Sequence, residues 1–202
     1  MGARYAILVT KHCDGFVNFR TIATFADGSP YGYGVQQSSW RGGQGDLARD
    51  FVDSARRHGI PPGFYYSLSG NHYLSVDSGE PAPPSTVGQR AATKEEYYDI
   101  MFTLVQELWG NYGALGEIWF HGSDPFISNA TFQARIAEIT GQLQPHALLM
   151  QGPSDANVGR KGAGETCEVA DPNWYPCPDP MACRGRGPSS DNGSFIPAEG
   201  AG

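Results

Sequence analysis

The sequence has no long hydrophobic run and no cluster of basic residues. Its 202 residues contain 14 Lys and Arg against 21 Asp and Glu, which gives a net charge of −7. Without a basic surface the chain lacks the charges that neutralise nucleic-acid phosphates. No apolar stretch reaches the roughly 18 to 20 residues that a membrane span needs. The composition therefore argues against nucleic-acid and membrane partners and favours a neutral or weakly charged ligand.

Cysteine is also scarce, and the sequence shows no signal peptide. Four cysteines allow three pairings if all are oxidised, and Cys167, Cys177 and Cys183 lack the paired spacing of a zinc site. We expect a loop disulfide among these three, and we predict neither a metal nor a cofactor. The apolar run at 6–9 is too short for a signal-peptide core. The first strand begins so close to Met1 that we expect the sequence to be a piece of a longer protein.

What the sequence does contain is a regular alternation of apolar runs and helical patterns. The apolar runs have the β-branched and aromatic content of buried strands, and they lie at 5–10, 63–67, 116–121 and 147–151. The helical patterns lie between them, at 46–58, 93–109 and 131–143. This order predicts a parallel α/β sheet with right-handed crossovers.

Capping residues and breaks in composition set the expected limits of these elements. Asp46 is a plausible N-cap, and Thr93 with Glu96 predicts a capping box in which hydroxyl and carboxylate each accept a first-turn amide. Beyond position 152 the composition changes to Gly, Pro, Ser and Asp without any period. We therefore expect one folded domain at 1–152 and an irregular tail that contains Gly, Pro and Cys at 153–202.

Polar and aromatic residues stand at the carboxyl ends of three predicted strands, which is where parallel α/β folds bind ligands. These residues are His12, Cys13 and Asp14 on the first strand, Tyr65, Tyr66 and Ser67 on the second, and His121 with Asp124 just after it on the third. Each one alone has a structural explanation, as a hydrogen-bonded histidine or a core aromatic. Their position on successive strand ends leads us to expect one shared pocket.

Three segments, in the same order and spacing, resemble the α-L-fucosidase family of glycoside hydrolases. ARYAILVTKHCDGF at 3–16 is similar to the family's AKYAVLTAKHHDGF, GFYYSL at 63–68 to GFYYS, and EIWFHG at 117–122 to ELWFDG. The PAE at 197–199 looks like one that follows the family's catalytic region. The family is a retaining (β/α)8 enzyme whose domain begins earlier, with a strand that carries HWG. The resemblance therefore implies a partial TIM-type barrel that acts on terminal α-L-fucose of a glycan or glycoconjugate.

The same resemblance implies roles for the residues at the strand ends. His12 matches the first of two sugar-binding histidines, Cys13 replaces the second, and Tyr65 or Tyr66 matches a tyrosine that contacts fucose. Rings pack on the C–H faces of a sugar while imidazole and phenol groups bond its hydroxyls, so this set suits a neutral deoxy-sugar, and Trp119 is expected to join it.

His121 stands where the family has its aspartate nucleophile. Retaining hydrolysis needs a carboxylate that attacks the anomeric carbon, paired with an acid about 5 Å away. Neutral imidazole would form a cationic adduct and could not offset oxocarbenium charge. Loss of a nucleophile costs roughly 10⁴ to 10⁶ in rate in other hydrolases, so the resemblance implies impaired catalysis.

Two other carboxylates bear on the chemistry. Asp124 follows the strand and is the alternative nucleophile, while Glu165 is the alternative acid because Lys161 stands where the family's glutamate is expected. Two hypotheses stay open: an α-L-fucosidase with impaired hydrolysis, and a non-catalytic fucose-binding or structural fragment. The resemblance also implies a secreted or lysosome- or vacuole-like location. Unpaired edges of a partial barrel predict self-association.

Overall fold

The computed structural model describes residues 3–68, 70–77, 79–121, 129–150, 165–167 and 198–200. Its centre is a four-stranded sheet with the strand order β1-β2-β5-β6. The strands are β1 (Ala6–Lys11), β2 (Pro62–Ser67), β5 (Glu117–His121) and β6 (Leu148–Met150). All three pairings are parallel, so the predicted parallel α/β sheet and its four strands are confirmed.

Three helices connect these strands, as the sequence predicts: α1 (Leu47–Arg57), α2 (Lys94–Asn111) and α3 (Ala130–Leu143). The Asp46 carboxylate caps α1 by accepting the amide of Arg49 at 2.9 Å. The Thr93 hydroxyl accepts the amide of Glu96 at 3.1 Å. The other half of the predicted capping box is wrong, because the Glu96 carboxylate accepts the amide of Ala26 at 2.8 Å instead.

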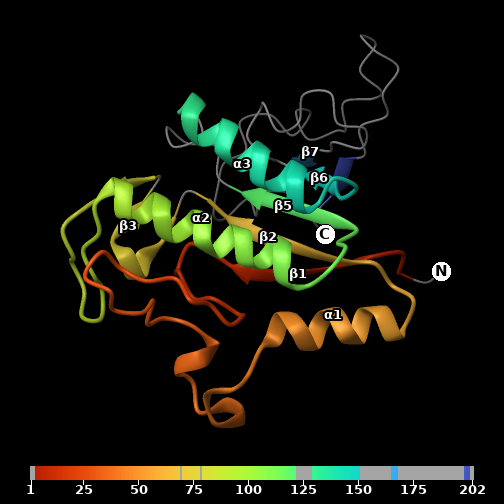
Figure 1. Cartoon of the computed structure of the whole chain (residues 1–202), viewed down its shortest axis with the longest axis horizontal. Coiled ribbons are helices and arrows are strands. Elements are labelled where there is room, and N and C mark those ends of the chain that lie inside the picture. Colours follow the sequence, from red (N-terminus) through yellow and green to blue (C-terminus); the bar gives the residue numbers. More distant parts are fainter. Residues whose placement is uncertain are drawn as a thin grey trace.

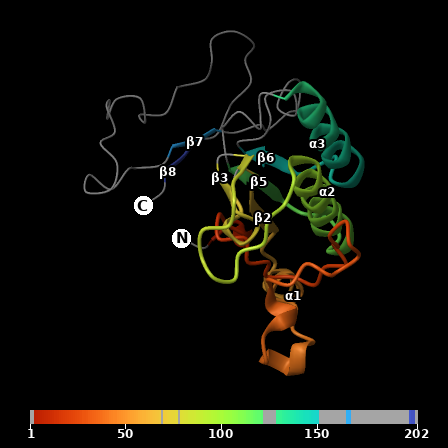
Figure 2. The ribbon, with the colours of Figure 1, turned by 90° about the vertical axis from the view of Figure 1, so that its left-hand side faces the viewer.

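The helices lie on one side of the sheet, as Figures 1 and 2 show. The four strands of this sheet are hydrogen-bonded in the order in which they occur along the chain. Two short strands that lie between β2 and β5 in the sequence form a small sheet of their own. Successive crossovers of one hand that add strands in one direction place every helix on the same face. A doubly wound sheet would reverse direction and carry helices on both faces.

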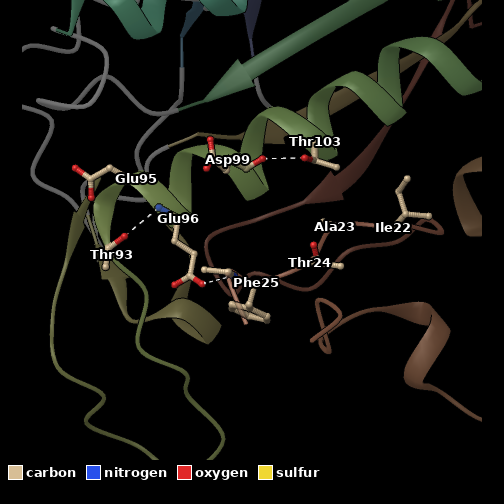
Figure 3. Close-up of a pocket in the computed structure, with 10 residues that line it drawn as sticks. Ile22, Ala23, Thr24, Phe25, Thr93, Glu95, Glu96, Asp99 and Thr103 are labelled. Carbon is tan, nitrogen blue, oxygen red and sulfur yellow. Dashed lines mark hydrogen bonds between the residues drawn. The ribbon is translucent and has the colours of Figure 1, made fainter. Parts of the chain in front are cut away.

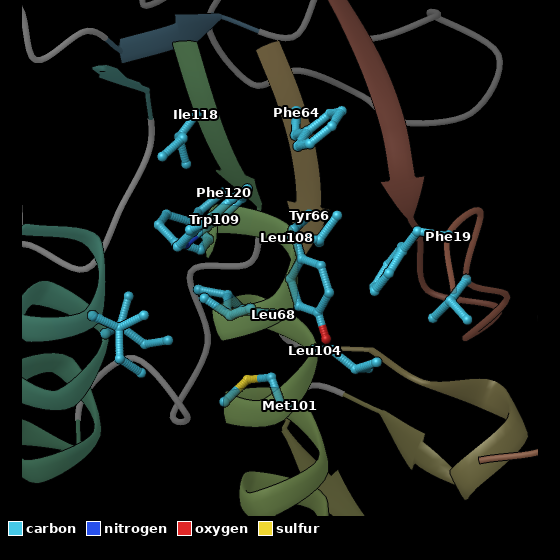
Figure 4. Packing of buried hydrophobic residues seen from close by; sticks show 14 of the residues in the cluster. Phe19, Phe64, Tyr66, Leu68, Met101, Leu104, Leu108, Trp109, Ile118 and Phe120 are labelled. Carbon is cyan, nitrogen blue, oxygen red and sulfur yellow. The ribbon is translucent and has the colours of Figure 1, made fainter. Parts of the chain in front are cut away.

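The main core fills the space between the helices and this face of the sheet. Phe64, Tyr66, Ile118 and Phe120 point toward α2, whose apolar stripe is buried against them (Figure 4). The stripe predicted from helical spacing is confirmed as core, and its members are Tyr97, Met101, Leu104, Val105, Leu108 and Trp109. Because side chains alternate along a strand, the residues next to these in sequence belong to the opposite face.

Two long loops gather at the carboxyl end of the sheet, on the left in Figure 1. The first, at 12–46, holds the short 3₁₀ segments Val35–Gln37 and Trp40–Gly43. The second, at 68–93, holds the 3₁₀ segment His72–Leu74 and a small antiparallel pair that the sequence does not predict, β3 (Val76–Asp77) with β4 (Glu80–Pro81). Backbone hydrogen bonds join the two loops, from the amide of His72 to the carbonyl of Cys13 and from Tyr73 to Asp14.

The segment predicted to be irregular contains two short strands that pair in parallel, β7 (Glu165–Cys167) and β8 (Ala198–Gly200). The rest of that segment lies outside the described residues, as do Cys177 and Cys183 of the expected disulfide. Cys13 is a free thiol. Among the described residues, no helix is long and apolar enough to cross a bilayer.

Candidate functional site

A shift in strand register sets the direction of the side chains that end β1. Val9 pairs with Tyr65, but Lys11 pairs with Tyr66, so one extra residue of β1 lies between the two pairs. Thr10 occupies this irregularity, and its hydroxyl donates to the carbonyl of Tyr65 at 2.6 Å. Irregularities of this kind re-aim side chains next to binding sites. Here it turns Lys11 into the core and leaves His12 exposed at the carboxyl end of the strand.

Three rings from three successive strand ends contact one another on the sheet face that the helices leave uncovered. The His12 imidazole stacks on the Tyr65 ring with centroids 5.5 Å apart and planes 7° apart. The Tyr65 ring meets Trp119 edge to face at 5.4 Å. The strand register places Tyr65 directly opposite Trp119. The structure therefore brings together three of the predicted site residues in one row, which we call the ring row.

Trp119 contributes an unused hydrogen-bond donor to the ring row. Its side chain is half-buried, and its indole nitrogen has no acceptor among the described residues. A buried donor without an acceptor costs roughly 1 to 3 kcal/mol, so an oxygen that reached it would stabilise the site.

Tyr66, the other candidate tyrosine, lies on the opposite face of β2. It is 1% exposed and packs in the core under α2. Its place in the core separates it from the ring row, so the expectation that Tyr66 contacts a ligand there is wrong. Tyr65 is therefore the tyrosine of this strand that stands with His12.

Lys11 is a residue of this region that the sequence analysis misses. Its side chain is fully buried, and its amine donates to the carbonyl of Ser67 at 2.8 Å and to that of Gly70. The amine also lies 5.3 Å from the centre of the Tyr66 ring. Burial lowers the pKa of Lys11 to about 7, because desolvation disfavours the charged form. Lys11 thus ties the end of β1 to the loop that follows β2. The only sequence signal for its burial is its position directly after an apolar run.

The remaining predicted residues fall in different places. The Cys13 thiol is exposed and lies 3.4 Å from the Ser67 hydroxyl. His121 is the last residue of β5 and pairs with Ser67, which puts its backbone at the same end of the sheet as the ring row. Glu165 belongs to β7, outside the four-stranded sheet. Asp124 lies outside the described residues.

Glu117 is a second group that the sequence analysis misses. It starts β5, is 3% exposed, and one of its carboxylate oxygens has no partner among the described residues. Desolvation raises the pKa of Glu117 to about 7. Such a pKa suits a general acid, but Glu117 is four residues before His121, or roughly 13 Å along a strand. It is therefore too far from that position to act as the paired acid of a retaining glycosidase.

Two cavities lie away from the ring row, and neither is lined by a predicted site residue. One, of about 580 Å³, lies between residues 22–26 and the start of α2, where Figure 3 shows Glu96 reaching toward the first loop. The other, of about 600 Å³, lies between α2 and α3 and is lined by Tyr98, Phe102 and Phe132 among others. In the part of the chain that the structure describes, no group of three or more His, Cys, Asp or Glu side chains could hold a metal.

A parallel α/β sheet with helices on one face belongs to the class of folds in which ligands bind at the carboxyl ends of the strands, and here that end carries imidazole, phenol and indole rings. The family follows from the sequence profile of the alpha-L-fucosidases, which matches residues 1–172. The chain belongs to the alpha-L-fucosidase family.

Two plant relatives agree with this assignment, and a solved structure agrees with the fold. Alpha-L-fucosidase 1 of Arabidopsis thaliana is 28% identical over 172 residues, which cover 82% of this chain and 30% of the relative. A protein of the same family from Oryza sativa subsp. japonica is 32% identical over 167 residues, covering 80% of this chain and 28% of the relative. A Bacteroides thetaiotaomicron structure of the same class superposes with a TM-score of 0.63 at 22% identity, over 98% of this chain and 40% of that one. The chain thus spans less than a third of the length of the two plant relatives.

Proposed function

We propose that this chain is an arc of an alpha-L-fucosidase (β/α)8 barrel. The ring row at its strand ends would bind terminal α-L-fucose of a glycan, and its hydrolytic step would be impaired. The observation that carries the proposal is the contact of His12, Tyr65 and Trp119 in one row, in a member of this family.

The one-directional strand order supports the barrel arc. Strands β1, β2, β5 and β6 follow one another with every helix on one face. A (β/α)8 barrel repeats this unit until the sheet closes, with the face opposite the helices turned inward. In the arc, that inward face is the one that carries Tyr65, Trp119 and Glu117.

The ring row supports binding of a neutral deoxy-sugar. The half-buried Trp119 ring offers an apolar surface to C–H groups and to the methyl group of fucose, while the exposed imidazole of His12 bonds hydroxyls. The net charge of −7 disfavours an anionic ligand. A fucosylated glycan or glycoconjugate is therefore the partner we propose.

The residue that ends β5 supports impaired hydrolysis. His121 stands at the position where the resemblance puts the nucleophile, and a retaining enzyme needs a carboxylate there. Asp124 and Glu165 are the remaining proposed participants, as alternative nucleophile and alternative acid. The family resemblance also favours a secreted or lysosome- or vacuole-like location, which fractionation of the native cells tests.

Titration with L-fucose, followed by ligand-observed NMR, tests the binding part of the proposal. We expect saturable binding, weaker binding of L-galactose, which has a hydroxyl added to the methyl group, and a loss of about tenfold for His12→Ala. His58→Ala is the matched control, because His58 is an exposed histidine just after α1 and should leave the affinity unchanged. Absence of binding, or equal losses in both variants, would sink the proposed site.

The two outer strands of the arc support self-association. β1 and β6 are the edges of the four-stranded sheet. Asn18 covers part of the β1 edge, because its side chain donates to the carbonyl of Val9 and its amide to that of Thr10. We therefore propose that copies associate through β6. Light scattering over a range of concentrations should show a rising mean mass, and a constant monomer mass would contradict this.

A further inference from the structure

The cavity between α2 and α3 lies on the helix side of the sheet, away from the proposed fucose site. The two helices lie side by side there (Figures 1 and 2). The volume of about 600 Å³ falls within the range of roughly 300 to 1,000 Å³ that small-molecule sites have. A ligand in this cavity would not compete with fucose, because the ring row is on the opposite face of the sheet.

Three rings form the apolar part of the cavity. The Phe132 ring stacks on Phe102 with centroids 5.4 Å apart, and the Tyr98 ring lies 5.3 Å from Phe132. Phe132 is buried, whereas Tyr98 and Phe102 are half-buried and keep part of their surface open. The exposed side chains of Asp99 and Gln106 add polar groups to the lining. Rings beside polar groups suit a sugar, whose C–H faces pack on rings while its hydroxyls form hydrogen bonds.

Asn129 lines the same cavity and begins an acceptor pattern for N-linked glycosylation. The pattern is Asn129-Ala130-Thr131, and both the asparagine and the threonine are exposed. Such patterns are frequent in sequences, so the pattern alone does not identify a modified residue. What distinguishes this one is that its asparagine lines an aromatic cavity. A second pattern, at 192–194, lies outside the described residues.

The hydrogen bonds of Asn129 are compatible with an attached sugar. Asn129 is the N-cap of α3, and its side-chain oxygen accepts the amide of Phe132 at 3.2 Å. A glycan is attached to the other polar atom, Nδ2, so the cap survives the modification. The Asn129 side chain also forms a hydrogen bond with Tyr98, which directs it toward the rings. Nδ2 carries two protons, and the glycosylated form keeps one of them for Tyr98.

From this arrangement we propose that Asn129 carries an N-linked glycan whose first N-acetylglucosamine packs on the rings of Tyr98 and Phe102. The glycan comes from a lipid-linked pyrophosphate donor through an oligosaccharyltransferase. A bond forms between Nδ2 and the anomeric carbon, and the bond from that carbon to the pyrophosphate oxygen breaks. The lipid pyrophosphate leaves, and one amide proton passes to a base of the transferase.

The attached sugar would join the two helices that border the cavity. It is linked to the residue that begins α3 and contacts rings of α2, so it adds a contact between the helices that only the folded chain makes. It also covers aromatic surface that is otherwise open to association with other molecules. The inference rests on the proposed secreted or lysosome- or vacuole-like location, because transfer takes place in the secretory pathway. It does not depend on fucose binding.

The first test identifies the modified residue. The 202-residue chain is secreted from a eukaryotic host behind a cleavable leader, and peptide masses are read before and after peptide:N-glycosidase F, which leaves aspartate in place of the glycosylated asparagine. We expect this conversion at Asn129, retained in Thr131→Ser and abolished in Thr131→Val, which keeps the shape of threonine without its hydroxyl. Asn192→Asp removes the second pattern and should leave the glycan at Asn129 unchanged. An unmodified Asn129 in the secreted wild type overturns the proposal.

The second test measures the contact with the cavity. An endoglycosidase trims the glycan to one N-acetylglucosamine, and urea unfolding compares this form with Asn129→Asp, which lacks the sugar and keeps an N-cap. We expect the sugar to raise the folding equilibrium constant about fivefold, as an aromatic contact does. Phe102→Leu should abolish this gain and leave the amount of glycan unchanged, because it removes the ring and stays apolar. Phe51→Leu is the matched control, since Phe51 is a half-buried phenylalanine of α1 and should keep the gain.

Circular dichroism establishes that each variant is folded. If Phe102→Leu does not fold, the trimmed wild type against Asn129→Asp still decides. A glycan at Asn129 that gives no gain in stability, or a gain that survives Phe102→Leu, overturns the contact with the cavity. Fucose titration of the same preparations separates this inference from the proposed function. Fucose binding without a glycan leaves the proposed function standing, and a stabilising glycan without fucose binding leaves this inference standing.

Discussion

Replacing His121 by aspartate is expected to raise the turnover of 4-nitrophenyl α-L-fucoside by at least about 10³-fold. The strand that carries this position keeps its parallel register, with Ser67 opposite His121, so an aspartate would stand at the end of an intact β5. Its carboxylate can attack the anomeric carbon and stabilise the oxocarbenium charge, which an imidazole cannot. Nitrophenolate departs without protonation, so the first step, which releases it, does not depend on the identity of the acid.

The assay should use the chain both alone and joined to the remaining barrel segments of the Arabidopsis relative, because the chain matches only 30% of that protein. His121→Asn is the matched control, since it has the size of aspartate without the charge. No gain in His121→Asp, with fucose binding intact, would show that loss of the nucleophile is not what limits hydrolysis.

Lys11 is expected to make the stability of the protein rise with pH between about 7 and 10.5. Burial lowers the pKa of Lys11 to about 7 in the folded chain, whereas the ordinary value is 10.5. Between these values the unfolded chain holds a proton on Lys11 that the folded chain has released. The free energy of unfolding therefore increases with pH across this window, by roughly 5 kcal/mol in total.

Urea unfolding at pH 7.5, 8.5 and 9.5 measures this dependence. Lys11→Met should lose the slope of about 1.4 kcal/mol per pH unit, since methionine has no proton to release. It should also lose the hydrogen bonds that tie β1 to the carbonyls of Ser67 and Gly70. Lys94→Met is the control, because Lys94 is only partly buried and should leave the slope unchanged. Parallel curves for the wild type and Lys11→Met would refute the buried, proton-releasing lysine.

The repeating elements could be predicted from the sequence because their signals are local. Asp46 and Thr93 cap helices through hydrogen bonds within a few residues, and the stripe of α2 follows from its own spacing. Capping by Glu96 was the exception, because its partner Ala26 is distant in sequence and offers a free amide. The hairpin of β3 and β4 has two residues in each strand, too few to leave a periodic pattern.

The candidate site was predictable in its location but not in its details. The end of each strand could be placed, but the choice between Tyr65 and Tyr66 depends on which face each occupies, and an error of one residue in register reverses that choice. The irregularity at Thr10 depends on pairing with β2, so the burial of Lys11 could not be foreseen. Glu117 was missed for the same reason, since its burial comes from neighbouring strands.

Impaired hydrolysis is tested most directly by the turnover of 4-nitrophenyl α-L-fucoside by the unaltered chain joined to the remaining barrel, at fucoside concentrations that the fucose titration shows to be saturating. We expect the site to be occupied by the fucoside and the turnover to be no faster than that of His121→Asn. Turnover well above that control, abolished by Asp124→Ala, would contradict it and make Asp124 the nucleophile.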